Sequence, residues 1–135
     1  MTEPSRPRII LDTDPGVDDA IAIITAARWA DLVGITTVAG NVPVEHTTAN
    51  ALRLRDLLGL DVTIHRGADR PLEAEPLHAR HVHGVVGLGE VDLPEPSRGP
   101  DSENAVEFLV EATRKEERLH LVPVGPLTNV ALALR

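Results

Sequence analysis

The chain has 135 residues and a formal net charge of −8, with 21 acidic and 13 basic side chains. This charge repels phosphate backbones and anionic lipid surfaces, so neither nucleic acid nor a membrane is expected as a partner. There is no cysteine, which excludes disulfides, thiolate metal sites and thiol nucleophiles.

The N-terminal residues 1–7 lack the apolar core of a secretory signal, and no apolar run is long enough to cross a bilayer. We therefore expect a cytoplasmic protein with a disordered tail over residues 1–7 and a folded domain over residues 8–135. The chain has one Trp and one Phe, so its core must be aliphatic, which is typical of parallel sheets covered by helices.

Acidic side chains are concentrated around a Pro-Gly turn that follows a predicted buried strand at residues 9–11. A predicted helix over residues 18–30 begins directly after the turn. Four carboxylates lie at this junction: Asp12, Asp14, Asp18 and Asp19. Neighbouring helical positions are about 100° apart, so Asp18 and Asp19 are expected to have separate roles.

Two interpretations of this acidic cluster remain open. Carboxylates this close repel one another and raise each other's pKa unless a cation lies among them, and oxygen ligands of this kind suit Ca²⁺ or Mg²⁺. Alternatively, Asp18 caps the helix, Asp19 occupies its first turn, and Asp12 and Asp14 make local turn hydrogen bonds.

The rest of the chain alternates strands with helices. Strands are expected at residues 32–38, 62–64 and 119–124, and Asn41 lies beyond the carboxyl end of the first of these. Helices are expected at residues 44–58, with Gly59 as the C-terminal cap, from a cap at Asp101 or Ser102 to about residue 115, and from residue 127 onward. Successive strand–helix–strand units with right-handed crossovers predict an α/β fold, in which helices cover both faces of an open, mostly parallel sheet.

Residues 66–100 are too long for an ordinary connection and predict a functional loop or lid, the most mobile part of the chain. His81 and His83 are separated by one residue, which in an extended stretch would place both rings on the same side. Such a pair alone is weak evidence for a metal site.

Four separated motifs resemble those of the inosine–uridine-preferring nucleoside hydrolases, which are calcium-dependent enzymes that split the N-glycosidic bond of ribonucleosides. The motifs occur in the family's order and are DTDPGVDDA, ITTVAGN, HVHGVVGLG and LVPVGPLTNVALA. The resemblance implies a Rossmann-like fold with Ca²⁺ as cofactor and a ribonucleoside as substrate.

For the metal site, the resemblance implies that Asp14 both binds calcium and acts as the general base toward water. Asp19 would bind the ion through both carboxylate oxygens, and the backbone carbonyl of Val124 would be a further ligand. The family commonly has Thr at that position, but only the carbonyl is needed.

For the substrate, the resemblance implies that Asp18 holds a ribose hydroxyl and that Asn41 positions the water or the sugar. His83 matches a histidine near the nucleobase, and Asp12 would have a supporting role. Neither a purine nor a pyrimidine preference is implied.

The family's domain is much longer than this chain, and its later half supplies further contacts to calcium, ribose and the leaving base. Residues 8–135 are therefore expected to be the N-terminal part of such a domain, without its C-terminal half, and a poor hydrolase alone. The sheet surface and strand edge left uncovered would favour association, as in a homo-oligomer, or partial disorder over a stable monomer.

Two rival functions remain. Asp12-Thr13-Asp14 also resembles the DxD motif of haloacid-dehalogenase-like phosphatases, in which the first Asp is the nucleophile beside Mg²⁺, although Gly16 stands where Thr or Val is usual. The other rival is a non-catalytic calcium-binding or ribose-binding remnant.

Overall fold

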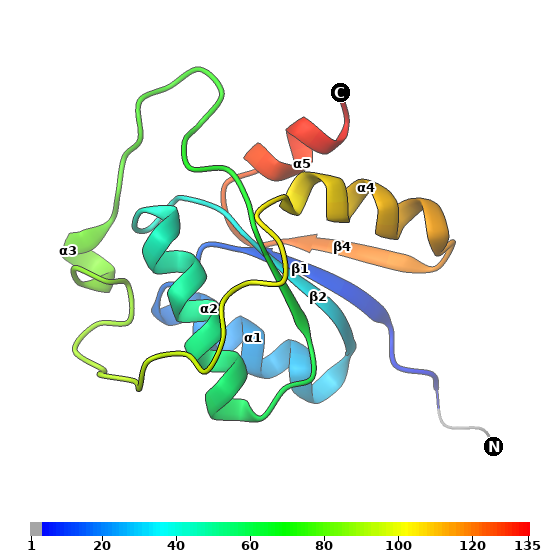
Figure 1. Ribbon diagram of the computed structural model, residues 1–135, viewed down its shortest axis with the longest axis horizontal. Helices are drawn as coiled ribbons and strands as arrows, with labels where there is room; N and C mark the ends of the chain where they lie inside the picture. Colours follow the sequence, from blue (N-terminus) through cyan, green and yellow to red (C-terminus); the bar gives the residue numbers. More distant parts are fainter. Residues whose placement is uncertain (1–3) are drawn as a thin grey trace.

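The computed structural model describes residues 4–135, which form a four-stranded sheet flanked by helices (Figure 1). The strands are β1 (Arg8–Thr13), β2 (Asp31–Thr37), β3 (Thr63–Arg66) and β4 (Leu119–Pro123). Their order is β3-β2-β1-β4, and each neighbouring pair is parallel. The predicted open parallel sheet is confirmed.

The helices lie on both faces of the sheet. They are α1 (Val17–Trp29), α2 (Val44–Leu58), α3 (Arg80–His83), α4 (Ala105–Lys115) and α5 (Thr128–Ala133). On one face α1 and α2 pack together against β1, β2 and β3, and on the other α4 packs against α5 and β3 (Figure 1). Among residues 4–135 we find no helix long and apolar enough to cross a membrane.

The main core lies between the sheet and the helix pair α1 and α2. It is aliphatic, as the composition predicts, and its centre is formed by Leu11, Ile23, Ile35, Ala51, Leu52, Leu54, Val62 and Ile64. The single Phe, Phe108 of α4, lies on the opposite face of the sheet. A Cβ on Gly34 would come within 2.6 Å of the Phe108 ring, so this glycine lets α4 approach β2 closely.

The cap predicted from sequence is correct at the C-terminal end of α2 and incorrect at the N-terminal end of α4. Gly59 ends α2 in a left-handed conformation at φ 61°, as predicted. The predicted caps of α4, Asp101 and Ser102, are wrong, because Asn104 accepts from the Glu107 amide instead. The two predicted caps tie their segment to β3: the carboxylate of Asp101 accepts from the Ile64 amide, and the hydroxyl of Ser102 bonds to His65.

The predicted disordered tail lies partly outside the described residues. Residues 1–3 are not described, and residues 4–7 have no regular secondary structure. The carbonyl of Pro7 already accepts a hydrogen bond from the Asp31 amide at 2.9 Å, so the chain is paired one residue before β1 begins.

His65 makes the stability of the fold depend on pH. Its ring stacks on Phe108 with centroids 3.7 Å apart, and burial lowers its pKa despite the opposing charge of Asp101. Because the pKa of His65 is lower in the folded chain, the unfolded chain binds more protons than the folded chain once the pH falls below the ordinary histidine pKa of about 6.5. The contribution of the neutral His65 ring to the free energy of unfolding is therefore complete above that pH and is lost as the pH falls below it.

We expect the stability advantage of the wild type over His65→Gln to shrink between about pH 7.5 and about pH 5, because only the wild type must protonate this buried ring. Urea unfolding followed by circular dichroism at both pH values measures the difference. An advantage that stays constant or grows toward acid would contradict the assignment.

Candidate functional site

The carboxyl ends of three parallel strands meet at one edge of the sheet, where ligands bind in open α/β folds. Asp14 follows β1, Asn41 lies in the turn after β2, and the Val124-Gly125 peptide follows β4. Parallel pairing of β1 with both neighbours therefore brings together residues that are far apart in sequence.

Asp14 lies in a narrow space at this edge and is only 5% exposed. Its Oδ2 accepts from the Asn41 amide at 2.8 Å, and its backbone carbonyl accepts from Asn41 Nδ2 at 2.9 Å. A Cβ on Gly125 would lie 2.7 Å from Asp14 Oδ1, and one on Gly40 would overlap Oδ2. Two glycines thus let the neighbouring strand ends close around the carboxylate.

Asp19 is buried beside Asp14 and is held by three donors. Its Oδ1 accepts from the Thr13 hydroxyl at 2.6 Å, and its Oδ2 accepts from the Gly16 amide at 3.3 Å and from Asn41 Nδ2 at 3.2 Å. Asn41 therefore connects both carboxylates. The alternative in which Asp18 caps the helix is wrong, because Gly16 is the N-cap and the Asp19 carboxylate accepts from its amide.

The two buried carboxylates have raised pKa values. Burial raises the pKa of Asp14 to about 7, and the negative charge of Asp19 adds to this, against the hydrogen bond from the Asn41 amide. Burial also raises the pKa of Asp19, although the bonds from Thr13 and Gly16 favour its charged form. Two carboxylates that resist ionisation together are the arrangement that a bound cation relieves.

The ligand atoms available here suit a hard cation but fill only part of its shell. Among residues 4–135, Asn41 is the residue that donates to the Asp14 side chain from elsewhere in the chain, and it does so at Oδ2. The Val124 amide donates to the Asp12 backbone carbonyl, and no hydrogen bond to the Val124 carbonyl is found in this part of the chain. In this part of the chain no three acidic, His or Cys side chains are arranged so that together they could hold a metal ion. The site therefore offers two carboxylates and one carbonyl, whereas Ca²⁺ takes six to eight oxygens.

Asp18 and His83 lie at the rim of the site. The Asp18 side chain is 80% exposed, and its Oδ1 is 3.9 Å from His83 Nδ1. That contact is not an ion pair, because Nδ1 accepts from the Val17 amide at 3.1 Å and so carries no proton. Because Nδ1 accepts this bond, Nε2 is the ring nitrogen that can donate.

The predicted pairing of His81 with His83 on one side of an extended stretch is wrong. Both residues lie in the helical turn α3, where positions two apart point in nearly opposite directions. His83 reaches the start of α1, while His81 is exposed.

Asp12 is fully buried on the opposite face of the sheet from α1. Its Oδ1 accepts from the hydroxyl of Thr36 and from Asn129 Nδ2, and its Oδ2 has no partner within residues 4–135. Burial raises the pKa of this carboxyl. A fully buried, hydrogen-bonded side chain cannot reach a phosphoester. Asp12 therefore cannot be the nucleophile that the phosphatase interpretation requires.

The sequence interpretation missed several residues that shape the site. Thr13 and the glycines at positions 40 and 125 position the two carboxylates, and Asn50 and Asn129 are buried polar residues that reach the adjoining turns. The glycines carry a usable signal, since each follows a predicted strand. The asparagines carry none, because their partners are distant in sequence.

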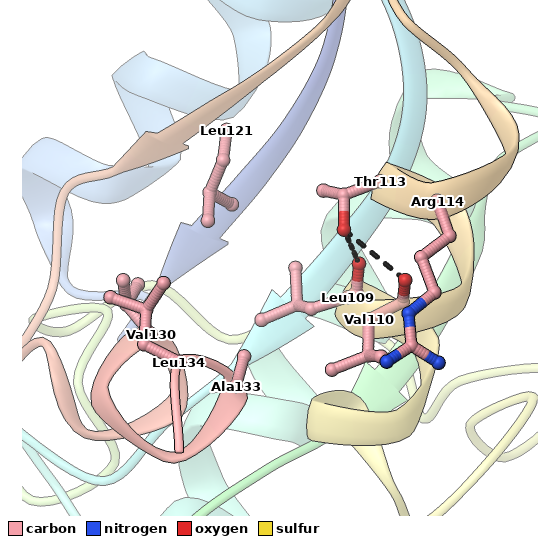
Figure 2. A pocket seen from close by; sticks show the side chains of 8 residues that line it. All are labelled: Leu109, Val110, Thr113, Arg114, Leu121, Val130, Ala133 and Leu134. Atoms are coloured by element: carbon pink, nitrogen blue, oxygen red, sulfur yellow. Dashed lines mark hydrogen bonds between the residues drawn. The ribbon is translucent and has the colours of Figure 1, made fainter.

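An apolar cavity of about 200 Å³ lies elsewhere, between α4, α5 and β4 (Figure 2). Its lining consists of Leu109, Val110, Thr113, Arg114, Leu121, Val130, Ala133 and Leu134. None of the carboxylates lines it, and the Thr113 hydroxyl donates to the carbonyls of its own helix. This cavity is therefore separate from the acidic site.

Comparisons with known proteins agree on one family. The sequence model described as inosine-uridine preferring nucleoside hydrolase matches residues 9–135. The pyrimidine-specific ribonucleoside hydrolase RihA of Shewanella sp. (strain MR-7) is 48% identical over 96% of this chain and 42% of its own length. Uridine nucleosidase 1 of Arabidopsis thaliana is 43% identical over 95% of this chain and 40% of its own length.

Solved structures give the same result. A plant nucleoside hydrolase, the PpNRh1 enzyme, superimposes with a TM-score of 0.89 at 35% identity over 96% of this chain and 42% of that one. The purine-preferring ribonucleoside hydrolase from Gardnerella vaginalis gives a TM-score of 0.85 at 36% identity over 94% of this chain and 43% of that one. The chain thus spans less than half the length of these relatives.

Proposed function

Since the chain belongs to the inosine-uridine preferring nucleoside hydrolase family, we propose that it forms part of the active site of a calcium-dependent enzyme that hydrolyses ribonucleosides. The observation that carries the proposal is the buried Asp14–Asp19 pair, joined by Asn41 at the carboxyl edge of the sheet. The products would be ribose and a free nucleobase.

Asp14 is the proposed general base. Cleavage of an N-glycosidic bond passes through an oxocarbenium-like sugar and needs a water that loses a proton to a nearby base. In the metal-free chain burial and Asp19 raise the pKa of this carboxyl to about 7. A cation bound beside it would lower that pKa, so the proposed role rests on the position of the carboxylate at the site. Its Oδ1 is the atom that would receive the proton, because the Asn41 amide occupies Oδ2.

Asp14, Asp19 and the Val124 carbonyl would hold Ca²⁺. All three offer oxygen, the ligand type that Ca²⁺ prefers, and the pair of raised carboxylate pKa values favours a cation between them. When bound, the ion would supply Lewis-acid activation of water and a grip on the ribose hydroxyls. The remaining coordination positions would be filled by ligands outside these three groups.

The rim residues are proposed to hold the nucleoside. Asp18 is exposed, so its carboxylate is free to accept hydrogen bonds from a ribose hydroxyl. His83 can donate from Nε2 toward the base, because Nδ1 is engaged by Val17. Asn41 would orient the water or the sugar while it holds both carboxylates.

The neighbours Asp18 and Asp19 provide a matched test. We expect Asp19→Asn to weaken calcium binding strongly, because Asp19 is buried beside Asp14, and Asp18→Asn to leave it nearly unchanged, because Asp18 points to solvent. Calorimetric titration of each variant with calcium, after removal of metal by a chelator, measures both effects. Equal losses in the two variants would contradict the assigned roles.

Hydrolysis is tested separately with inosine and uridine in excess calcium, by following the release of reducing sugar. Release that requires calcium and is lost in Asp18→Asn supports the enzyme. Calcium binding without sugar release from either nucleoside would instead support the non-catalytic remnant.

A further inference from the structure

Asn50 is a buried polar residue of α2 that connects two separate segments. Its side chain is fully buried, and Nδ2 donates to the Pro15 carbonyl at 3.1 Å and to the Val86 carbonyl. An amide nitrogen has two hydrogens, so both are used. One goes to the turn that follows Asp14, and the other to the long loop between β3 and α4.

The loop lies directly on that turn. Gly87 has a φ of +101°, and a Cβ there would lie 2.9 Å from Asn50 Nδ2 and 3.0 Å from the Pro15 carbonyl oxygen. Only a residue without a side chain fits this contact. Backbone closure at the base of the loop is provided by the Gly89 amide, which donates to the His83 carbonyl at 2.7 Å.

The remaining oxygen of Asn50 argues against a role in packing alone. Oδ1 is buried and has no hydrogen-bond partner within residues 4–135. An unpaired buried polar atom is destabilising, and an apolar side chain of similar size would avoid this cost. What Asn50 provides instead is the pair of donors that join the loop to the turn.

We propose that Asn50 is a positioning residue that holds the loop of residues 83–89 onto the Pro15 turn and so sets where His83 lies relative to Asp14. The contact between Val17 and His83 fixes one end of this loop, and Asn50 fixes its middle. The role of His83 in binding a nucleoside rests on the proposed function, whereas the hydrogen bonds by which Asn50 joins the loop to the turn do not.

The test uses Asn50→Asp, a nearly isosteric change that replaces both donor hydrogens by an acceptor oxygen. The matched control is Thr48→Val on the same helix, which removes the buried hydroxyl bond to Thr37 without touching the loop. Amide exchange of residues 84–89 should quicken by about tenfold or more in Asn50→Asp, equivalent to about 1.4 kcal/mol of local closing energy, and should not do so in Thr48→Val.

A second readout follows the His83 ring nitrogens by NMR. Without the Asn50 donors, the hydrogen bond from the Val17 amide to His83 Nδ1 should form only part of the time, so the Nδ1 and Nε2 resonances should move toward a common averaged value. A general loss of stability in Thr48→Val would not produce this change. Gly87→Ala is a second route, because its Cβ would push the loop away from Asn50 without altering α2.

The proposal is overturned if exchange rises along α2 but not in residues 84–89, or if the His83 resonances match those of Thr48→Val. If Asn50→Asp does not fold, Gly87→Ala decides by the same two readouts. Neither measurement needs calcium or nucleoside. The role of Asn50 can therefore be confirmed or rejected even if the chain proves not to bind calcium or to hydrolyse nucleosides.

Discussion

Asp14→Asn should abolish calcium binding and any nucleoside hydrolysis while leaving the fold intact. The amide is nearly isosteric, and its oxygen can still accept from the Asn41 amide. It has neither the charge that a cation needs nor the basicity that water needs. Loss of a general base typically lowers rates by about 10²–10⁴-fold, so hydrolysis by the variant should fall by at least that range.

The same change should not destabilise the calcium-free protein. Burial and the charge of Asp19 raise the pKa of Asp14, so removing its ionisable group relieves a repulsion. Thermal unfolding with and without calcium tests this expectation, because a ligand that binds only the folded state raises Tm. The wild type should gain stability from calcium and Asp14→Asn should not.

The control is Asp31→Asn, which removes an exposed carboxylate that pairs with Arg8 at the start of β2. It should keep the calcium response of the wild type. A calcium-dependent rise in Tm that survives in Asp14→Asn would place the ion elsewhere.

Asn129→Ala should have the largest effect on stability. Asn129 is fully buried, and its side chain bonds to three separate segments. Its Nδ2 donates to Asp12 Oδ1 at 2.8 Å and to the Thr37 carbonyl at 2.9 Å, and its Oδ1 accepts from the Ala68 amide at 2.9 Å. Each partner left unpaired costs about 1–3 kcal/mol, so the total is comparable with the whole stability of a small domain, about 5–15 kcal/mol.

Asn104→Ala is the matched control, since it removes an asparagine that caps α4 at the surface. Loss of such a cap costs about 1 kcal/mol. The midpoint of urea unfolding should therefore fall slightly for Asn104→Ala. For Asn129→Ala the cooperative unfolding transition should move to very low urea or be lost. Similar shifts in both would mean that the buried network contributes little.

Local patterns in the sequence determined the elements and the place of the acidic site. The helix predicted over residues 44–58 has those bounds in the structure, because its apolar stripe and the glycine after it act within the helix itself. Asp14 and Asn41 were placed beyond the carboxyl ends of two successive strands, and the strand–helix–strand pattern predicted that these strands are parallel, as they are.

Tertiary structure alone decided the contacts between elements. Asp101 and Ser102 satisfy capping chemistry, yet β3 lies close enough to use both side chains, and Asn104 became the cap. His83 turned toward α1 because the loop forms a helical turn there, which periodicity over a few residues could not reveal. Short signals of this kind compete with partners that only the folded chain brings near.

The buried asparagines show the same limit most clearly. Asn129 and Asp12 are 117 positions apart, and Asn50 and Val86 are 36 apart. In a single sequence each is an ordinary polar residue within a helical pattern. Their roles arise because burial removes water and leaves the carbonyls, amides and carboxylates of distant segments as the only partners within reach, and that set of neighbours exists only after the sheet and its helices have packed.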